Sequence, residues 1–228
     1  ITIQTEDGGL YIYGTGYTNA ADYLGFAVVA YVKDSSGVSD IISIGLEADM
    51  NNMVELSGSD ITTIETSDAS VTVRYDAENT GDERTLRVPT SATVIYNGRY
   101  DNTLETKSAD YYNYILAPER GTVIYLDNNG DSRIDLVYVT TYVNYIADRV
   151  NADDDRIVLK TAAGSAATLE LKPDATEYRF NIIKDGAQIE LSEIEEDDVV
   201  SVSESLGSDD KHYVLYVSDF RGEGEIAT

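Results

Sequence analysis

The chain has 228 residues, with 42 acidic and 16 basic side chains, a formal net charge of −26 and no cysteine. A surface this acidic repels nucleic-acid phosphates and anionic lipid headgroups, so we expect neither nucleic-acid binding nor peripheral membrane binding. The lack of cysteine excludes disulfides, thiolate zinc sites and cysteine nucleophiles. No apolar run reaches the roughly eighteen residues that a membrane-spanning helix needs, so membrane insertion is not expected either.

The composition favours strands. There are 18 Tyr, 3 Pro and no Trp, and the aromatic and β-branched residues come in short bursts between clusters of Asp, Asn, Gly and Ser. A single helical turn capped by Asn19 is expected at 19–22, and Pro89 marks a strand boundary because proline cannot donate to a ladder. The strands expected in the first hundred residues are 1–4, 10–13, 26–32, 40–44, short strands within 53–64, 70–75, 85–88 and 92–96.

Further along, two apolar runs, 122–126 and 134–140, flank a polar loop and predict a β-hairpin. A helical segment is expected before it, at 108–116. The sequence then repeats this order with strands at 157–160 and 168–171, a turn at Asp185-Gly186 that matches Asn97-Gly98, and a closing hairpin of 199–203 and 213–218. A short helix is expected at 191–196, where Ser192 and Glu195 have capping-box spacing.

The three hairpins, which end near positions 45, 140 and 218, divide the chain into two near-complete units and one partial unit. We name them the N-terminal unit (1–45), the middle unit (46–142) and the C-terminal unit (143–228). The expected fold is all-β, an elongated tandem of small antiparallel β-barrel or sandwich modules with one or two short helical turns. Because the chain starts at Ile1 without a basic and apolar leader, we expect it to be a piece of a longer polypeptide.

Three stretches resemble a known group of proteins: GTVIYLDNNGDSRIDLVYVTTY at 121–142, Tyr23-Leu24-Gly25 with its YVKDSSG continuation, and KDGAQIELSEIEEDDVVSVSES at 184–205. Together they are similar to the repeated β-rich region of large secreted Firmicutes proteins that carry S-layer homology domains. The resemblance implies a secreted, cell-surface or cell-wall location in a Gram-positive bacterium and a spacer or presentation role. The three-helix anchoring domain of those proteins is not in this sequence, so wall binding is assigned to no residue.

One loop has the spacing of a calcium site. Its oxygen-bearing side chains occupy positions 1, 3, 5 and 9, as in loops that wrap a hard cation, and the carbonyl of Arg133 would fill position 7. Position 6 is Ser132 rather than Gly, and position 12 is Tyr138 rather than a bidentate Glu. The alternative is a plain Asn129-Gly130 hairpin turn with solvated acids. The candidate ligands are Asp127, Asn129, Asp131 and Asp135.

The other hairpin loops keep less of this pattern, with Asp34, Ser36 and Asp40 in the first and Ser208–Lys211 in the last. His212 is the sole histidine, so no histidine-based catalytic triad or multi-histidine metal site can form; we expect it to be exposed. The acidic run 195–198 is expected to be a solvated turn. Tyr111, Tyr112 and Tyr114 offer either an aromatic platform for sugars or, through Tyr111 and Tyr114, a packing face on the sheet.

No catalytic or nucleotide-binding signature is present; Gly14-Thr15-Gly16 lacks the third glycine and the following helix of a dinucleotide site. We therefore expect a non-enzymatic structural module of a bacterial cell-surface protein, with Ca²⁺ as the one expected cofactor. Its expected partners are neighbouring domains of a larger surface protein, with cell-wall polymer or glycan as further candidates. The alternatives are an adhesion or carbohydrate-binding module that uses tyrosine-rich faces, and a glycosidase with two paired carboxylates.

Overall fold

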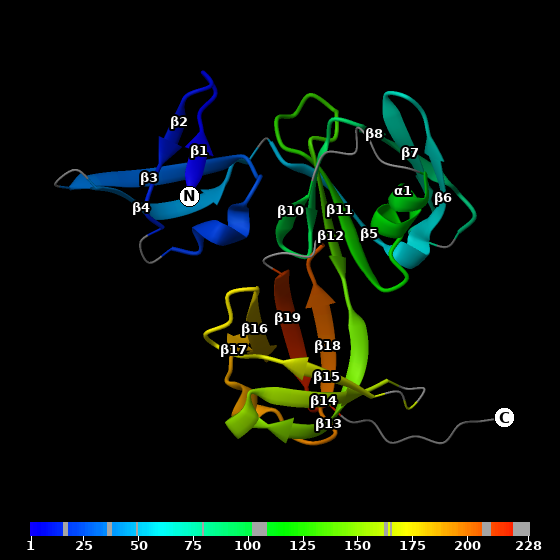
Figure 1. Ribbon diagram of the computed structural model, residues 1–228. Coiled ribbons are helices and arrows are strands. Elements are labelled where there is room, and N and C mark those ends of the chain that lie inside the picture. The colour runs from blue at the N-terminus through cyan, green and yellow to red at the C-terminus, as the bar shows by residue number, and fades with distance from the viewer. Residues whose placement is uncertain are drawn as a thin grey trace.

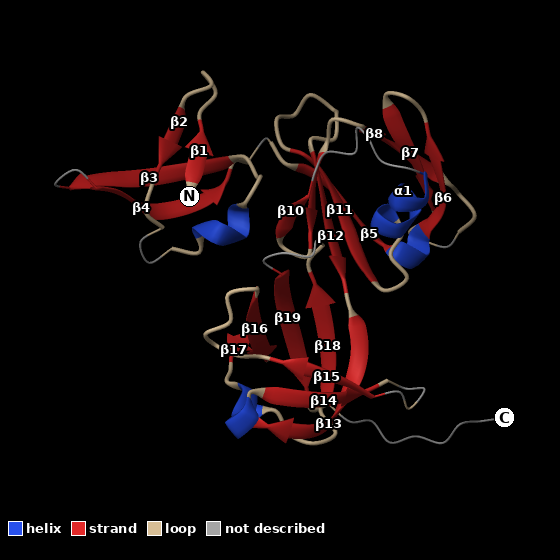
Figure 2. Ribbon diagram, viewed as in Figure 1, coloured by secondary structure: helices blue, strands red, loops and turns tan. Residues whose placement is uncertain are grey.

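The computed structural model describes residues 1–15, 18–35, 38–48, 50–78, 80–101, 109–161, 164, 166–206 and 211–220. Strands dominate these ranges and the helices are short, as Figure 2 shows, which confirms the all-β prediction. The strands form several sheets, and no sheet of the described strands closes into a barrel. Of the two architectures predicted, the open sandwich therefore applies. None of the helices in these ranges is long and apolar enough to cross a membrane.

The N-terminal unit consists of two hairpins joined by a 3₁₀ turn (Figure 1, blue). β1 pairs with β2 and β3 pairs with β4, both antiparallel. Gly14 adds a parallel bridge to Asp40 on the other edge of β4. The 3₁₀ turn directly follows Asn19, where a capped helical turn was predicted. The elements are β1 (Thr2–Gln4), β2 (Leu10–Ile12), η1 (Ala20–Tyr23), β3 (Val28–Ser35) and β4 (Val38–Leu46).

The middle unit contains two sheets. One has the order β6-β7-β8 and the other the order β10-β9-β12-β11-β5, with α1 packed beside β6. Its elements are β5 (Asn52–Ser57), η2 (Gly58–Asp60), β6 (Ile61–Thr66), β7 (Ser70–Tyr75), β8 (Arg84–Pro89), β9 (Thr93–Tyr96), β10 (Arg99–Asp101), α1 (Ala109–Leu116), β11 (Gly121–Asp127) and β12 (Leu136–Thr141).

The C-terminal unit forms one sheet with the order β15-β14-β13-β18-β19-β16-β17. In Figure 1, β12 of the middle unit leads directly into β13. The elements are β13 (Val143–Asn151), η4 (Ala152–Asp154), β14 (Arg156–Lys160), β15 (Ala166–Glu170), β16 (Tyr178–Lys184), β17 (Ala187–Gln188), η5 (Leu191–Glu193), β18 (Val199–Glu204) and β19 (Lys211–Ser218).

The middle and C-terminal units have the same strand order. The sequence β5-β11-β12-β9-β10 corresponds to β13-β18-β19-β16-β17, and β6-β7-β8 corresponds to β13-β14-β15. The relative directions of neighbouring strands also agree. In each of these five-strand orders the third pair of neighbours, β12 with β9 and β19 with β16, is parallel, and the other three pairs are antiparallel. The repeat predicted from the order of turns is therefore present in the strand pairings. The parallel pairs were not foreseen. Between their members lie a short strand, a helical segment and the first strand of the closing hairpin, a connection long enough for parallel pairing.

In each of the two complete units the first strand connects two groups of strands. In the C-terminal unit β13 is continuous: residues 143–146 pair with β18 and residues 146–151 pair with β14. In the middle unit the same path is split by η2 into β5, which pairs with β11, and β6, which pairs with β7. The first strand is thus the element that joins the closing hairpin to the second hairpin of the unit.

The two predicted dipeptide turns match closely. Asn97 and Gly98 have φ of 48° and 76°, and Asp185 and Gly186 have φ of 53° and 77°. Each dipeptide connects two directly paired residues, Tyr96 with Arg99 and Lys184 with Ala187. Positive φ at both positions is the requirement of the hairpin turn that Asn-Gly and Asp-Gly favour. These two turns therefore confirm the strongest local signal of the repeat.

Each complete unit has its own core. In the middle unit α1 contributes Tyr112, Ile115 and Leu116, which are 5, 0 and 0 % exposed. Tyr112 is therefore a core residue, and the prediction of an aromatic platform that includes it is wrong. Residues three and four apart lie on one face of a helix, and here that face packs against the sheet. Burial of the Tyr112 ring is therefore favoured over its exposure to a ligand. The side chains of Tyr111 and Tyr114 lie outside the described residues.

Each sheet takes its strands from one of the ranges 1–45, 46–142 and 143–228, apart from Leu46 at the end of β4. The division of the chain into domains at residues 45 and 142 stays a prediction. Independent folding of the units stays a prediction.

The predicted capping pair differs from the one observed. Glu193 Oε2 accepts the N–H of Glu190 at 2.8 Å, so the pair lies two residues before Ser192 and Glu195.

Candidate metal-binding loop

The candidate calcium loop connects β11 to β12. Leu126 and Leu136 form the last paired residues of the hairpin, so residues 127–135 make up the connection. A plain two-residue Asn129-Gly130 turn would need positive φ at both residues. Gly130 has φ of 75°, but Asn129 does not have a positive φ. The plain-turn alternative is therefore wrong, and the loop is a longer folded connection.

Asp127 organises this loop from its base. Its side chain is 2 % exposed, and both carboxylate oxygens accept hydrogen bonds. Oδ1 accepts the N–H groups of Gly130 at 2.7 Å and Asn129 at 3.3 Å. Oδ2 accepts the N–H of Ser132 at 2.9 Å and Nδ2 of Asn52 at 3.2 Å. A carboxylate has about four acceptor sites, so these four donors fix the orientation of the Asp127 carboxylate at the base of the loop.

Two further side chains brace the tip of the loop. Asn129 Oδ1 accepts the N–H of Asp131, and Asp131 Oδ1 accepts the N–H of Arg133, both at 2.9 Å. Ser132 has φ of 66°, the left-handed conformation that an EF-hand loop reserves for glycine at position 6. The backbone thus makes the sharp turn of a calcium loop although the sequence has serine there. The departure at position 6 is one of residue type and not of conformation.

The fold brings three of the four predicted ligands together. One carboxylate oxygen from each of Asp127, Asp131 and Asp135 lies within 4.8 Å of the others, with Asp127 buried, Asp135 half-buried and Asp131 exposed. The oxygen of Asn129 is engaged with Asp131 N–H. Calcium takes six to eight oxygen ligands at about 2.3–2.6 Å. The three acids can supply part of such a shell, and carbonyl groups and water would have to supply the rest.

The electrostatics of the cluster differ between its members. Burial acts to raise the pKa of Asp127, but hydrogen bonds from Asn52 and from three backbone N–H groups outweigh it, so the pKa lies below its usual value. Burial raises the pKa of Asp135, and repulsion from Asp131 and Asp127 raises it further against the opposing Asn128 N–H and Arg133. A cation beside Asp135 would relieve that repulsion.

The loop also lies against the N-terminal unit. Asn128 Nδ2 donates to the carbonyl of Gly25 at 2.8 Å. Next to this bond the ring of Phe26 stacks on Tyr138, with centroids 5.6 Å apart, and both pack against Ile95, Leu126 and Leu136. This contact was not predicted, because no local pattern links Asn128 to a residue about a hundred positions earlier.

Gly25 permits this close approach. Its φ is 80°, and a Cβ there would lie 2.5 Å from Leu136 Cδ2 and 2.6 Å from the Tyr138 hydroxyl. That hydroxyl is buried and has no hydrogen-bond partner among the described residues, and burial raises the pKa of Tyr138 to about 12. The sequence signal was the glycine itself, at the entrance to a hairpin, where a close backbone contact is one of the reasons for glycine.

Where the structure describes them, His212 and Asp198 are not exposed as predicted. His212 is half-buried rather than exposed, with Nε2 3.2 Å from Asn181 Nδ2, because β19 places it between β16 and the Asn97-Gly98 turn. Asp198 is also buried, at 0 % exposed, so the prediction of a solvated turn fails for that member of the run 195–198. Its Oδ2 accepts Glu195 N–H at 3.0 Å and lies 3.5 Å from Lys184 Nζ.

The equivalent hairpin loops lie mostly outside the described residues. Ser36 and 208–210 are not described, nor is the side chain of Asp34, so only Asp40 and Lys211 can be placed. Lys211 pairs with Glu204. Their partial resemblance to the calcium loop therefore stays a prediction.

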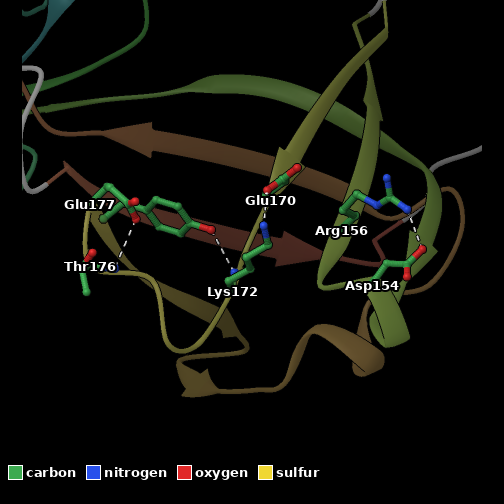
Figure 3. Close-up of polar contacts among 7 residues, drawn as sticks. Asp154, Arg156, Glu170, Lys172, Thr176 and Glu177 are labelled. Carbon is green, nitrogen blue, oxygen red and sulfur yellow. Dashed lines mark hydrogen bonds and ion pairs between the residues drawn. The ribbon is translucent and has the colours of Figure 1, made fainter.

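A group of charged residues on the C-terminal unit is internally paired (Figure 3). Lys172 Nζ lies 2.8 Å from Glu170 Oε2, and Arg156 contacts Asp154 at 2.5 Å. The Lys172 ammonium lowers the pKa of Glu170, and Glu170 raises that of Lys172. Glu170 and Asp154 are each held by a base, with side chains about half exposed, so this group has the character of surface ion pairs rather than of an acid and base set apart for catalysis.

No protein-family model matches the sequence, and no curated protein matches it significantly. Family membership is thus not shown, and the role of the chain has to be inferred from its own residues.

Proposed function

We propose that this chain is a non-enzymatic spacer in a secreted bacterial cell-surface protein of the S-layer-associated kind, and that the loop 127–135 binds Ca²⁺. The observation that carries the proposal is the repeated strand order of the middle and C-terminal units, which are joined end to end through β12 and β13. Repetition of one unit extends a chain without requiring a ligand or a reaction.

Contacts between the units support a stiff spacer rather than beads on a flexible linker. Asn97 of the middle unit donates to the Glu204 carbonyl of the C-terminal unit. Leu206 of the C-terminal unit packs against the core of the middle unit. On the other side, Asn51 bonds both the N–H and the carbonyl of Ala27, at 2.8 and 2.9 Å. Each junction therefore has side-chain bonds in addition to the covalent connection.

The charge supports an exposed location. A net charge of −26 keeps a tandem of strand-rich units soluble and opposes association between their edges. The same charge favours divalent cations over anionic ligands. Within the described residues, Asp127, Asp131 and Asp135 are the group whose carboxylates are close enough to share a metal ion.

The calcium part of the proposal is tested by thermal unfolding with Ca²⁺ and with a chelator. Free ion at a hundred times its Kd adds about 2.7 kcal/mol to the free energy of unfolding. Asp131→Asn is the sharp variant, because Asp131 is exposed and an amide oxygen still accepts the Arg133 N–H. It should abolish the calcium response with little change in the chelated protein. An unchanged wild-type midpoint at saturating Ca²⁺ rejects the ion and leaves the spacer role standing.

The spacer role itself is tested against the adhesion alternative with a glycan array and a pull-down on purified cell-wall polymers. The spacer predicts no saturable binding. Tyr112 cannot serve as the probe since it is buried, whereas Tyr31 and Tyr100 are 64 and 62 % exposed. Saturable glycan binding that Tyr31→Ala or Tyr100→Ala removes would replace the spacer by an adhesion module.

A further inference from the structure

The N-terminal unit follows the element order of the two complete units in shortened form: among the described residues it has no counterpart of β13 or of the short edge strand β17, and the single residue Gly14 stands where β16 stands. A hairpin is followed by a residue that bridges in parallel to the last strand, then by a helical turn and a closing hairpin. In the C-terminal unit these elements are β14–β15, β16, η5 and β18–β19; in the N-terminal unit they are β1–β2, Gly14, η1 and β3–β4. Among the described residues, nothing in the N-terminal unit corresponds to β13.

Both strands that β13 would join have an open edge. The carbonyl of Ala27 accepts Glu47 N–H, so Ala27 faces β4, and alternation turns the N–H and carbonyl groups of Val28 and Ala30 to the opposite edge of β3. At the ends of β1 the carbonyl of Ile1 accepts the N–H of Tyr13, and the N–H of Thr5 donates to the carbonyl of Gly9, so the backbone groups of Ile1 and Thr5 face β2. By the same alternation the backbone groups of Thr2 and Gln4 point to the open edge of β1. No strand in the described part of the chain pairs with either edge.

The unit also exposes much apolar surface. Nine of the seventeen exposed large apolar residues among those described lie in it, and Leu46 at the end of β4 is a tenth, whereas Ala20 and Ile41 are its only buried apolar residues among those described. Ile12 and Leu10 on β2 are 81 and 69 % exposed, and Leu46 on β4 is 53 % exposed. In the middle unit the matching hairpin has Val71 and Val73 fully buried. An incomplete unit of this fold accounts for the contrast.

We propose that the edges of β3 and β1 form a binding site for one extended polypeptide strand, the first strand of another unit of this fold, which docks antiparallel to both. The other two units show what fills this position. β13 presents Tyr145 and Ala147 to its core, and β5 presents Val54 and Leu56. The occupant therefore has apolar residues at alternate positions and no excess of acids, because an acidic strand would be repelled. Backbone bonds supply affinity and the alternate side chains supply specificity.

This inference rests on the strand pairings and is independent of the spacer role and of calcium. The probe is a labelled peptide with the sequence of residues 143–151, titrated against the full chain up to about 1 mM. Saturable binding with one peptide per chain is expected, and absence of saturable binding overturns the proposal. A peptide with proline in place of Ala147 should bind at least about tenfold more weakly, because it loses a ladder donor and distorts the strand.

The position of binding is tested with Ala30→Pro, which removes an outward N–H and spares the bonds between β3 and β4. It should weaken the peptide at least about tenfold at an unchanged thermal midpoint. Undiminished binding would place the peptide elsewhere, for example in exchange with β13, and would contradict the site. Hydrogen exchange on the unmodified chain gives a check without mutation. The amides of Val28 and Ala30 should gain protection with peptide, and failure of both to do so overturns the site.

Discussion

The side-chain amide of Asn97 donates to the main-chain carbonyl of Glu204 at 2.7 Å, while its Oδ1 accepts the N–H of Thr141 at 2.8 Å. Asn97 is 7 % exposed and sits in the turn between β9 and β10. One side chain therefore ties that turn both to the end of β12 and to the C-terminal unit. The junction of the two complete units depends on a residue that the sequence identifies only as a turn former.

Asn97→Ala should destabilise the chain by about 2–3 kcal/mol, since it removes two hydrogen bonds, leaves the Thr141 N–H unpaired and keeps the left-handed φ without the asparagine that tolerates it. Urea unfolding measures the change. Asp185→Ala is the matched control, because Asp185 has the same turn position and φ of 53° but is exposed. The control should cost about 1–2 kcal/mol, the penalty of a left-handed alanine alone. Equal effects at the two positions would show that the bond to Glu204 contributes nothing.

Asp127→Asn should destabilise the hairpin with or without calcium. The amide replaces one acceptor oxygen by a donor and so opposes either the bonds from Gly130 and Asn129 or those from Ser132 and Asn52. A loss of about 2–3 kcal/mol is expected for buried donors left unpaired. Chelated protein in a denaturant titration is the right sample. A stability equal to that of the wild type would mean that Asp127 serves only as a metal ligand.

The lowered pKa of Asp127 also predicts that the folded chain loses stability in acid. Because its pKa is lowered in the folded chain, its stabilising contribution is complete above the ordinary value of 3.8 and is lost as the pH falls through the lowered pKa. Ionisation of Asp135 has the opposite effect on the stability of the fold. Its raised pKa means that ionisation opposes folding, an effect that is absent below 3.8 and complete above the raised pKa.

Asp135→Asn should therefore raise the stability of the calcium-free chain at neutral pH, and the gain should fade as the pH drops toward 3.8. The amide oxygen can still accept the Asn128 N–H. Thermal midpoints recorded between pH 3.5 and 7.5, roughly the range over which carboxylates titrate, would show this. With Ca²⁺ added, the same variant should lose the metal-dependent stabilisation of the wild type. A variant less stable than the wild type in chelator at pH 7 would contradict the assigned repulsion.

Tyr112→Ala should unfold the middle unit rather than impair binding. Tyr112 packs with Ile115 and Leu116 of α1 against the sheet, and removal of a buried aromatic ring costs about 3–5 kcal/mol. Circular dichroism and urea titration would register the loss. Tyr100→Ala is the control, because Tyr100 is 62 % exposed, and a surface change of this type usually stays within about 0.5 kcal/mol.

Local chemistry made much of the fold predictable. The all-β class, the hairpins, the paired turns at Asn97-Gly98 and Asp185-Gly186 and the repeat all follow from residue order and turn preference. Parallel pairing of β9 with β12 did not follow, because register between distant strands is fixed by packing and not by any local signal. Burial of Tyr112, His212 and Asp198 was missed for the same reason, since each depends on an element far away in sequence.

The site was predictable in part. Spacing alone identified Asp127, Asp131 and Asp135 as neighbours, because a loop closed by its own hairpin keeps its side chains close. The role of Asp127 as a hydrogen-bond acceptor for the loop backbone was not evident, and neither was the left-handed Ser132, which takes the conformation that the pattern assigns to glycine. The bond from Asn128 to Gly25 crosses two units and has no counterpart in the linear pattern.

A measurement of the distance between the two complete units tests the spacer most directly. The absence of cysteine allows two spin labels to be placed without background, at Asp68→Cys in the middle unit and Asp153→Cys in the C-terminal unit, both of which are exposed. A rigid spacer predicts one narrow distance distribution, which broadens when Asn97→Ala removes the bond to Glu204. A broad distribution in the unmodified chain, unchanged by Asn97→Ala, would mean that the units move independently and would contradict the account.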